Sequence, residues 1–411
     1  MSKHLFSPAD ILLPKKDFEK WSVIACDQFT SRMDYWEDAA KIVGDAPSTL
    51  NLIYPEAYLG KTDKNKVTKN INAEMIKYLE NGVYNEYKDA FIYVERIQSD
   101  GKMRAGLVGA VDLNSYDYRE GSKSKVRATE KTVLERIPPR VEIRKGAVTE
   151  LPHVLMLMDD VNNTIIEPLG DMAKAGKLTK IYDFTLMLGG GSIKGYLVPA
   201  ELNDVIAEKI EALGALHSGI TLAVGDGNHS LASAKDCYEL DPENVSSYAL
   251  CELVNIHTPA LEFEPIYRTV EGCEPVSIFA SFKEYLSDCG SKISEKATEG
   301  AQRITFVAGN TETELFIVNA PHTLAVGTVQ LFLDSYLAKG GKGEVDYIHG
   351  EDEVKNIASK ENACGFIYDG MSKSELFVAV EKEGVLPRKT FSMGHARDKR
   401  YYTEVRKIRS I

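Results

Sequence analysis

Short apolar runs alternate with amphipathic stretches along the whole chain, and the apolar runs have the composition of β-strands. Residues 89–97 (DAFIYVERI) and 105–113 (AGLVGAVDL) are rich in β-branched or aromatic side chains and are bounded by polar turn residues. Residues 153–160 (HVLMLMDD) form a continuous apolar run, which is typical of a strand buried on both faces. Further short strands are predicted at 303–309, 313–319 and 365–369.

Residues 184–198 (FTLMLGGGSIKGYLV) predict two strands joined at the three glycines 189–191. Three consecutive glycines also suggest a phosphate-binding loop. No helix with Gly-Lys-Ser/Thr follows them, however, so the Walker pattern is absent. We therefore predict a hairpin turn at this point.

Several amphipathic stretches predict helices. Residues 66–82 place apolar side chains at three- and four-residue intervals and end in Asn81-Gly82, a helix stop signal. Residues 199–216 begin with Pro199 and carry one apolar face. Further helices are predicted at 324–340, 352–360 and 372–384.

The mixture of strands, hairpin signals and helices predicts a mixed α/β (α+β) fold, with mixed or antiparallel sheets and flanking helices. We divide the chain into an N-terminal region (1–150), a central region (151–270) and a C-terminal region (271–411) with a basic tail. The boundaries are soft, because no stretch between the regions has the composition of a linker. We therefore expect the regions to pack closely together.

The most prominent chemical feature is the turn in TLAVGDGNHSLASAKDCYEL, residues 221–240, between a predicted strand and a predicted helix. Its glycines permit unusual dihedral angles and close approach of a ligand, and the N-terminus of a helix attracts anions. Asp226 and His229 place a carboxylate and an imidazole on the same turn, where they can transfer a proton. The candidates for phosphate or nucleotide contact here are Gly225, Gly227, Asn228 and Ser230, the last two also being candidate helix caps. A plain strand-to-helix turn with a surface Asp and a capping His remains the alternative.

Composition narrows the class of partner. The 411 residues carry a net charge of −12, so the protein's overall field repels nucleic acid and anionic membranes. No apolar run approaches the roughly 18 residues of a membrane span. The N-terminus MSKHLFSPADILLPKKDF lacks the long apolar stretch of a secretory signal, so we expect a cytosolic protein. The six cysteines form no Cys-x-x-Cys pair, which predicts buried thiols rather than a zinc or redox site.

The order strand, Asp-Gly-x-His, amphipathic helix resembles the central motif of the bacterial family catalogued as domain of unknown function 1015 (DUF1015), whose usual form is Asp-Gly-His-His-Arg. Other segments resemble elements of that family in the same order along nearly the whole chain. They are SVIACDQFTS (22–31), LNLIYPEA (50–57), RATEKT (127–132), HVLMLMDD (153–160), NIHTPALEFEPIYRTV (255–270) and LPRKTFSMG (386–394).

The same turn is similar to one in the ParB and sulfiredoxin superfamily, where it lines a nucleotide site, and that superfamily includes free-serine kinases. The resemblance implies a ParB/sulfiredoxin-like core and a phosphotransferase for a small hydroxylated metabolite, with free L-serine as the leading acceptor. It leaves ATP, ADP and pyrophosphate open as donors, with Mg²⁺ as an expected cofactor. A nucleotide-binding regulator without transferase activity, or a ParB-like nucleic-acid partner, are the alternatives. We expect a small-molecule substrate, no nucleic acid and no membrane; the oligomeric state stays open.

This sequence departs from the family pattern where charge matters. Asn228 replaces the first His of the motif, Ser230 replaces its Arg, and Thr129 stands where a His is usual. Because a serine cannot supply the charge of an arginine, a bound phosphate needs a cation from another segment. By their place in matching segments, the resemblance points to Lys131, Arg268 and Lys389.

The resemblance also suggests roles for individual residues. Phosphoryl transfer needs a base for the attacking hydroxyl and cations on the developing charge. Glu130 is the candidate base, with Lys131 and Thr132 as phosphate contacts, unless Glu130 is an ordinary exposed side chain of a charged loop. Asp226 could hold Mg²⁺ and His229 could bond the transferring phosphate. Asp27, at a strand end, is a candidate for contact with substrate or metal.

The C-terminal stretch is strongly basic in an otherwise acidic protein. Between 386 and 410 it carries eight Lys or Arg residues against Asp398 and Glu404. These cations could fold over a phosphate site or dock on the protein's own acidic body. We favour docking.

Overall fold

The computed structural model describes residues 4–119, 121–294 and 296–409, and its fold is mixed α/β, as predicted. The chain forms two compact units. The larger comprises Met1–Leu261 and Gly394–Ile411, and the smaller comprises Glu262–Met393. Of the predicted regions, 1–150 and 151–270 both supply strands to the larger unit's main sheet, so the compact units divide the chain differently from our three regions.

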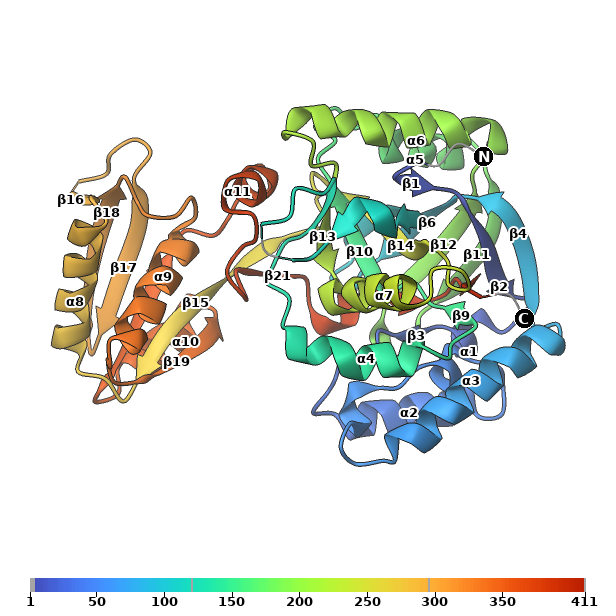
Figure 1. Ribbon diagram of the computed structural model, residues 1–411, viewed down its shortest axis with the longest axis horizontal. Coiled ribbons are helices and arrows are strands. Elements are labelled where there is room, and N and C mark those ends of the chain that lie inside the picture. The colour runs from blue at the N-terminus through green and yellow to red at the C-terminus, as the bar shows by residue number, and fades with distance from the viewer. Residues whose placement is uncertain (1–3, 120, 295, 410–411) are drawn as a thin grey trace. The chain divides into compact units, whose positions relative to one another are not determined.

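A mixed sheet forms the centre of the larger unit (Figure 1). Its strands run in the order β11 (Thr179–Thr185), β12 (Ser192–Leu197), β5 (Ile92–Ile97), β6 (Met103–Asp112), β14 (Tyr248–Asn255), β10 (Val154–Met158), β13 (Leu222–Asp226), β8 (Val126–Ala128) and β7 (Tyr116–Asp117), with β1 (Phe6–Ser7) beside β6. Strand β10 is parallel to β14 and antiparallel to β13, which is in turn parallel to β8. The strand ends of β8 and β13 therefore lie side by side.

Successive side chains of each strand point to opposite faces of this sheet, and both faces are buried. On β6, Leu107 and Val111 pack into one core, and Val108 and Ala110 pack into the other. The first core is covered by α4 (Ile137–Arg144), α5 (Ile166–Lys174), α6 (Asn203–Ala212) and α7 (Asn228–Leu240). The second core contains Trp36 of α2 (Met33–Val43). The N-terminal part of the chain also forms the helices α1 (Phe18–Trp21) and α3 (Lys64–Glu80).

The predicted hairpin is present as β11 and β12, whose turn contains a short 3-10 helix at Met187–Gly189. The predicted strand 89–97 is instead divided between β4 (Tyr84–Ala90), which pairs with β2 (Ala9–Pro14), and β5. Asp89, just before the break, has a left-handed backbone with φ of 48°. The chain therefore bends there and enters a second sheet, a long-range pairing that the local pattern does not encode.

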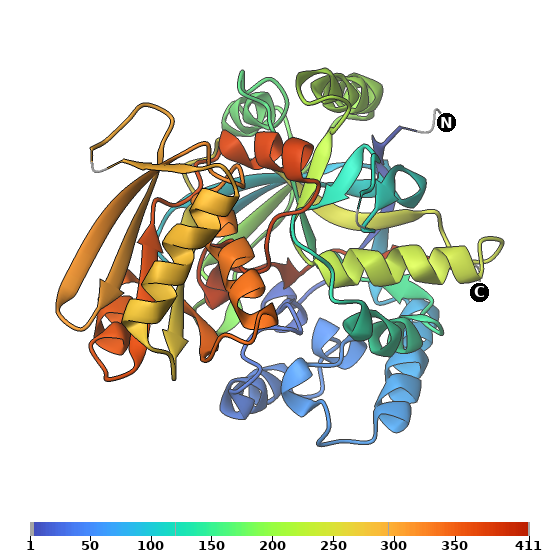
Figure 2. The same ribbon diagram turned by 60° about the vertical axis from the view of Figure 1, so that its left-hand side comes forward.

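The smaller unit contains an antiparallel sheet with helices on both faces (Figure 2). Its strands run in the order β16 (Lys292–Ser294), β18 (Thr311–Val318), β17 (Gln302–Ala308), β20 (Ala363–Tyr368), β15 (Phe263–Glu271) and β19 (Glu344–His349), with β21 (Phe391–Met393) beside β15. Phe282 of α8 (Pro275–Asp288) and Phe332 of α9 (Ala325–Ala338) pack on Phe366 of β20. On the opposite face, Val354 of α10 (Glu351–Ala358) packs directly over Gly365. Helix α11 (Glu375–Glu383) completes the predicted set of helices.

The part of the basic C-terminal stretch that begins at Gly394 docks within the larger unit, as predicted, whereas Arg388 and Lys389 belong to the smaller unit. Strand β22 (Tyr401–Tyr402) pairs with β3 (Val23–Ile24), and β23 (Arg406–Lys407) pairs with β9 (Thr149–Glu150). Its cations form ion pairs with acidic residues of the body: Arg400 with Glu252, Arg406 with Glu150, Lys407 with Glu86, and Arg409 with Asp241.

The cysteines follow the sequence prediction only in part. Four of the six are buried, Cys26 is half-buried and none forms a disulfide. Cys289, the C-cap residue of α8, is exposed. Among the described residues, no helix combines the length and apolar character needed to cross a bilayer.

Two ion pairs of the tail give contrasting stability predictions. Arg400→Met removes the cation that contacts Glu404 and leaves Glu252 paired with Arg104 alone, and both carboxylates are fully buried. We expect a loss of about 3–5 kcal/mol in the free energy of unfolding. Lys407→Met, which removes an exposed pair with Glu86, should cost about 0–1 kcal/mol. Urea unfolding of both variants measures the difference; equal losses would contradict the structural role of Arg400.

Candidate functional site

The predicted turn joins β13 to α7 through a glycine that no other residue could replace without strain. Gly227 has φ of 82°, and a Cβ there would lie 3.0 Å from Cδ2 of His153 and 3.1 Å from Cα of Val154. Gly227 is itself the N-cap of α7, and no side chain caps the helix, so the expected capping by Asn228 or Ser230 is wrong. The reason is that the helix already begins at Asn228.

Asn228 has a feature that points to a ligand. Among the described residues, its Oδ1 is buried yet has no hydrogen-bond partner. A buried oxygen without a donor costs free energy unless another group satisfies it. The position of this atom, on the first residue of α7, places it where an anion or its bound cation would meet the turn.

The RATEKT segment (127–132) lies against this turn because β8 and β13 are parallel neighbours. The hydroxyl of Thr129 donates to the carbonyl of Val224 at 2.7 Å. The amide of Val133 donates to Nε2 of His229 at 3.2 Å, so the ring of His229 holds the end of the segment against α7. Together these bonds bring Glu130 and Lys131 to the same cavity as Asp226 and His229.

The cation beside Asp226 is Lys399, which sequence reasoning missed. Its Nζ lies 3.2 Å from Oδ2 of Asp226, and both side chains are partly exposed. Lys399 belongs to the basic tail, and only the tail's general charge pointed to it in the sequence. The segment that carries it lies 173 positions beyond the turn in the chain, and no local pattern links the two.

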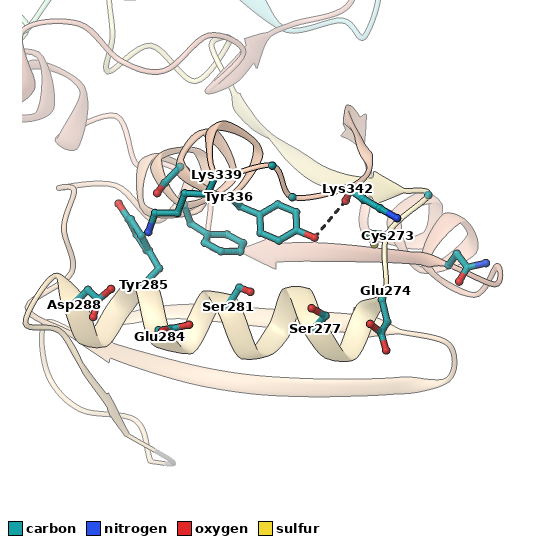
Figure 3. Close-up of a pocket in the computed structure, with 16 residues that line it drawn as sticks. Cys273, Glu274, Ser277, Ser281, Glu284, Tyr285, Asp288, Tyr336, Lys339 and Lys342 are labelled. Atoms are coloured by element: carbon teal, nitrogen blue, oxygen red, sulfur yellow. Dashed lines mark hydrogen bonds between the residues drawn. The ribbon is translucent and has the colours of Figure 1, made fainter.

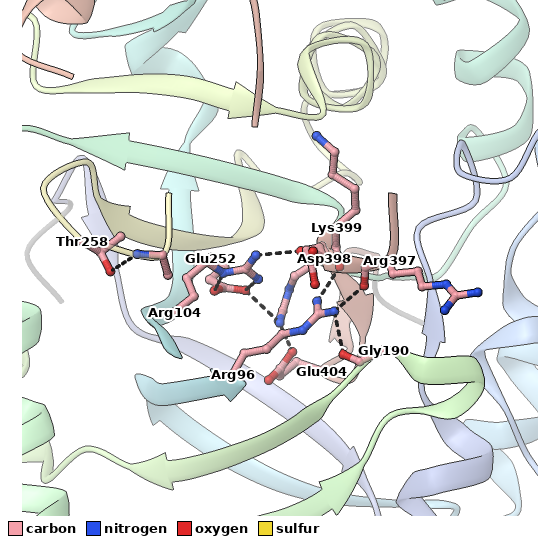
Figure 4. A network of polar contacts seen from close by, with 11 residues as sticks. Arg96, Arg104, Gly190, Glu252, Thr258, Arg397, Asp398, Lys399 and Glu404 are labelled. Carbon is pink, nitrogen blue, oxygen red and sulfur yellow. Dashed lines mark hydrogen bonds and ion pairs between the residues drawn. The ribbon is translucent and has the colours of Figure 1, made fainter. Parts of the chain in front are cut away.

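Two buried arginines position the backbone around Lys399 (Figure 4). Arg96 of β5, with no exposed surface, donates to the carbonyls of Lys399, of Arg397 at 2.6 Å and of Gly190 at 3.0 Å. Arg104 of β6 donates to the carbonyl of Asp398 at 2.9 Å and pairs with Glu252. Three successive carbonyls of the tail, 397–399, are therefore held by guanidinium groups of the central sheet. We call this arrangement the arginine clamp.

Asp27 belongs to a series of hydrogen-bonded polar side chains on the cavity wall. Its Oδ2 lies 3.3 Å from Nε2 of His153, whose Nδ1 lies 2.6 Å from the hydroxyl of Tyr402. That hydroxyl also accepts from the amide of Cys26 at 3.1 Å. Because both ring nitrogens of His153 meet oxygen atoms, the charged imidazolium can donate to both.

The contacts among Asp27, His153 and Tyr402 shift the pKa of each of these groups. Burial alone would raise the pKa of Asp27, but His153, Gln28 and Lys399 outweigh it and hold that pKa well below its ordinary value. Burial alone would lower the pKa of His153, but Tyr402 and Asp27 outweigh it and raise that pKa well above its ordinary value. Burial raises the pKa of Tyr402. Near neutral pH, Asp27 is therefore an anion paired with an imidazolium.

Asp27, His153 and Tyr402 line one cavity of about 690 Å³ in the larger unit, and Lys399 lies outside its lining. Of the predicted site residues, it is lined by Asp27, Glu130, Lys131, Asp226, Gly227, Asn228, His229 and Ser230. Helix α4 adds Arg140 and Arg144, which pair with Glu56 and Glu150. A cavity of this size is typical of a small-molecule site.

Four predicted residues lie outside that lining. Gly225 is half-buried on β13, one residue before Asp226. Thr132 is buried, and among the described residues its Oγ1 has no hydrogen-bond partner. Arg268 and Lys389 belong to the smaller unit, where Arg268 is fully buried and Lys389 is exposed. Their predicted contact with phosphate stays a prediction.

The smaller unit has a cavity of its own, of about 850 Å³, between α8 and α9 (Figure 3). Acidic side chains (Glu274, Glu284 and Asp288) and basic ones (Lys339 and Lys342) share its lining. It contains none of the predicted site residues, and its mixed charge favours no single class of ligand.

Metal ligands are sparse. Over residues 4–119, 121–294 and 296–409, no three His, Cys, Asp or Glu side chains gather as they would around a metal ion. Mg²⁺ differs from other metals in often taking one or two carboxylates, with phosphate oxygens and water completing the shell. Asp226, with the unsatisfied Oδ1 of Asn228 two positions away, fits that smaller requirement.

Comparison with known proteins supports the resemblance drawn from the motifs. A family model described as "Protein of unknown function (DUF1015)" matches residues 7–336, which confirms it. No curated protein matches the chain.

Solved structures resemble the chain only distantly. A free serine kinase mutant in complex with ADP shows 11% identity and a TM-score of 0.40, covering 73% of this chain and 91% of that one. A conserved hypothetical protein from Pyrococcus furiosus shows 11% identity and a TM-score of 0.36, with 73% and 94% covered. SbnI with a C-terminal truncation, from Staphylococcus aureus, shows 12% identity and a TM-score of 0.36, with 70% and 82% covered. Likenesses at this level assign no function.

The Asp27–His153 pair yields a pH prediction. Its stabilisation is lost as pH falls through the lowered pKa of Asp27, and again as pH rises through the raised pKa of His153. Asp27→Asn should lower the pKa of His153, since burial then acts without its anion. An NMR titration of the His153 ring measures this, with the exposed Asp45→Asn as control. An unchanged His153 pKa in Asp27→Asn would show that the pair is not formed.

Proposed function

This chain belongs to the DUF1015 family, and we propose that it transfers a phosphoryl group to the hydroxyl of a small metabolite, with free L-serine as the leading acceptor. The observation that carries the proposal is Lys399 at Asp226. The turn that lost the family's arginine has a cation beside it, supplied by the docked tail. A nucleotide or pyrophosphate is the proposed donor.

The turn has the electrostatics that a phosphate requires. The first turn of α7 directs its backbone N–H groups and the positive end of its dipole toward the cavity. Lys131 adds positive charge to the cavity lining, and Lys399 adds positive charge beside Asp226. In the transition state, negative charge develops on the transferring phosphoryl group and on the leaving oxygen. Fixed cations of this kind stabilise that charge.

The acceptor would lie toward Glu130 and Asp27. In the proposed step, the acceptor oxygen bonds to phosphorus, its proton passes to the Glu130 carboxylate, and the bond from phosphorus to the donor's leaving oxygen breaks. Asp27 stays anionic, so it is a poor base but a suitable partner for the ammonium group of an amino acid. Arg140 lines the same cavity and could meet a carboxylate.

Mg²⁺ belongs to the proposal as a cofactor held chiefly by the donor's phosphates. Asp226 and Asn228 are the residues that would contribute ligands. When bound, Mg²⁺ would neutralise negative charge on the phosphates. In its absence, Lys399 neutralises Asp226 and so weakens the repulsion between that carboxylate and an incoming phosphate.

A nucleotide-binding regulator is the second candidate, and Ser230 favours it. With no arginine on the turn, nucleotide could bind without the charge that transfer requires. A ParB-like role on nucleic acid is disfavoured, because the ion pairs of Arg400, Arg406, Lys407 and Arg409 tie these tail cations to the protein's own carboxylates.

A turnover assay separates the two candidates. The protein is incubated with Mg²⁺, with ATP, ADP or pyrophosphate, and with a panel of amino acids and hydroxy acids. We expect a phosphorylated product from one donor and acceptor pair, detected by ³¹P NMR. Stabilisation by a nucleotide in a melting experiment, with no product from any pair, would instead favour the regulator.

Variants then test the site. Lys399→Met, Asp226→Asn and His229→Ala should each lower kcat/KM at least about 100-fold, the order of effect of removing one charge-stabilising group. Arg397→Met is the matched control, because Arg397 is an exposed cation two positions from Lys399. We expect near-normal turnover for it. If Lys399→Met were as active as Arg397→Met, the cation at Asp226 would have no part in transfer.

A further inference from the structure

Three cations of the smaller unit gather around a single aromatic ring. The guanidinium of Arg268 lies 4.5 Å from the ring centroid of Tyr347, that of Arg388 lies 5.1 Å away, and the ammonium of Lys389 lies 4.9 Å away. Each pair of charges is therefore within about 10 Å, roughly one Debye length at 0.1 M salt. We call Tyr347, Arg388 and Lys389 the tyrosine cluster.

The register of the sheet and one buried side chain create this cluster. Arg268 of β15 lies directly opposite Tyr347 of β19. Its Nε donates to Oε1 of Gln330 at 2.8 Å, and its two terminal nitrogens donate to the carbonyls of Arg388 at 3.0 Å and Lys389 at 3.2 Å. Arg268 thus fixes the turn at 388–389 through its backbone and is a positioning residue for it.

The turn at 388–389 has a backbone conformation that occurs in neither an extended strand nor a right-handed helix. Lys389 has a left-handed backbone with φ of 52°, which costs free energy in a residue with a side chain. Arg388 is fixed separately, because its Nε donates to the hydroxyl of Tyr347 at 2.7 Å. Both side chains remain exposed.

The charges of the turn are not neutralised by the protein. Among the described residues, no carboxylate forms an ion pair with Arg388 or Lys389, in contrast to Arg400, Arg406, Lys407 and Arg409 of the following tail. The ring of Tyr347 attracts cations through its quadrupole but carries no charge that could cancel theirs. Two exposed cations are thus kept together in a protein whose net charge is −12.

We propose that the tyrosine cluster, in the smaller unit, is a binding site for a small phosphate-bearing anion. A planar guanidinium and an adjacent ammonium match phosphate oxygens, which accept from both. The bound anion supplies the negative charge that the turn lacks. Arg388 and Lys389 contact it, and Arg268 holds them in place.

The test uses the full chain with Lys399→Met, which removes the cation beside Asp226 in the larger unit, and inorganic pyrophosphate as probe. Titration calorimetry at low salt should detect one pyrophosphate site. Adding Arg388→Gln and Lys389→Gln should raise the Kd at least ten-fold. Lys292→Gln, an exposed lysine of β16 at the opposite end of the same sheet, should leave it unchanged. Melting curves verify that each variant is folded.

Several results would overturn the proposal. They are no pyrophosphate binding to the Lys399→Met protein, equal affinity with and without Arg388→Gln/Lys389→Gln, or a cluster-dependent complex with a DNA oligonucleotide but not with pyrophosphate. None of these measurements needs catalytic turnover. Failure of the proposed phosphotransferase activity would therefore leave this test intact.

Discussion

The arginine clamp is the interaction on which the candidate site depends. Two arginines buried in the central sheet have donors that must be satisfied, because an unsatisfied buried guanidinium is costly. The carbonyls of residues 397–399 accept from several of these donors, while Nε of Arg96 has no partner among the described residues. Fixing those carbonyls fixes the path of the tail, and the path of the tail places Lys399 beside Asp226. The site is thus completed by backbone contacts made well away from any ligand.

A similar device appears in the smaller unit. Arg268 is buried in its sheet and holds the carbonyls of Arg388 and Lys389, as Arg96 holds those of Arg397 and Lys399. In both units a buried arginine binds the main chain of a segment whose own cations stay exposed or partly exposed. Backbone carbonyls neutralise only part of the buried charge. Glu252 supplies more of the compensation in the larger unit, where it contacts Arg104 and Arg400.

The Asp-Gly-x-His turn and the RATEKT segment were identified from local pattern and resemblance, and eight of the predicted residues line one cavity. Their roles in that cavity stay predictions. The replacement of the family's arginine by Ser230 led us to expect that a bound phosphate needs a cation from another segment, which also stays a prediction. It did not identify that cation. The candidates Arg268 and Lys389 came from matching motifs, whereas the side chain beside Asp226 is Lys399, outside any motif.

Local sequence therefore determined the strands, the helices, the strained turn at Gly227 and the acidic balance of the whole protein, because these follow from side-chain pattern, backbone freedom and composition. Tertiary structure decided which segments meet. The pairing of β22 with β3, the division of 89–97 between two sheets and the partner of Asp226 all join residues far apart in the chain. Such contacts are selected by burial and by the hydrogen bonds of buried charges. Neither leaves a periodic signature in the sequence.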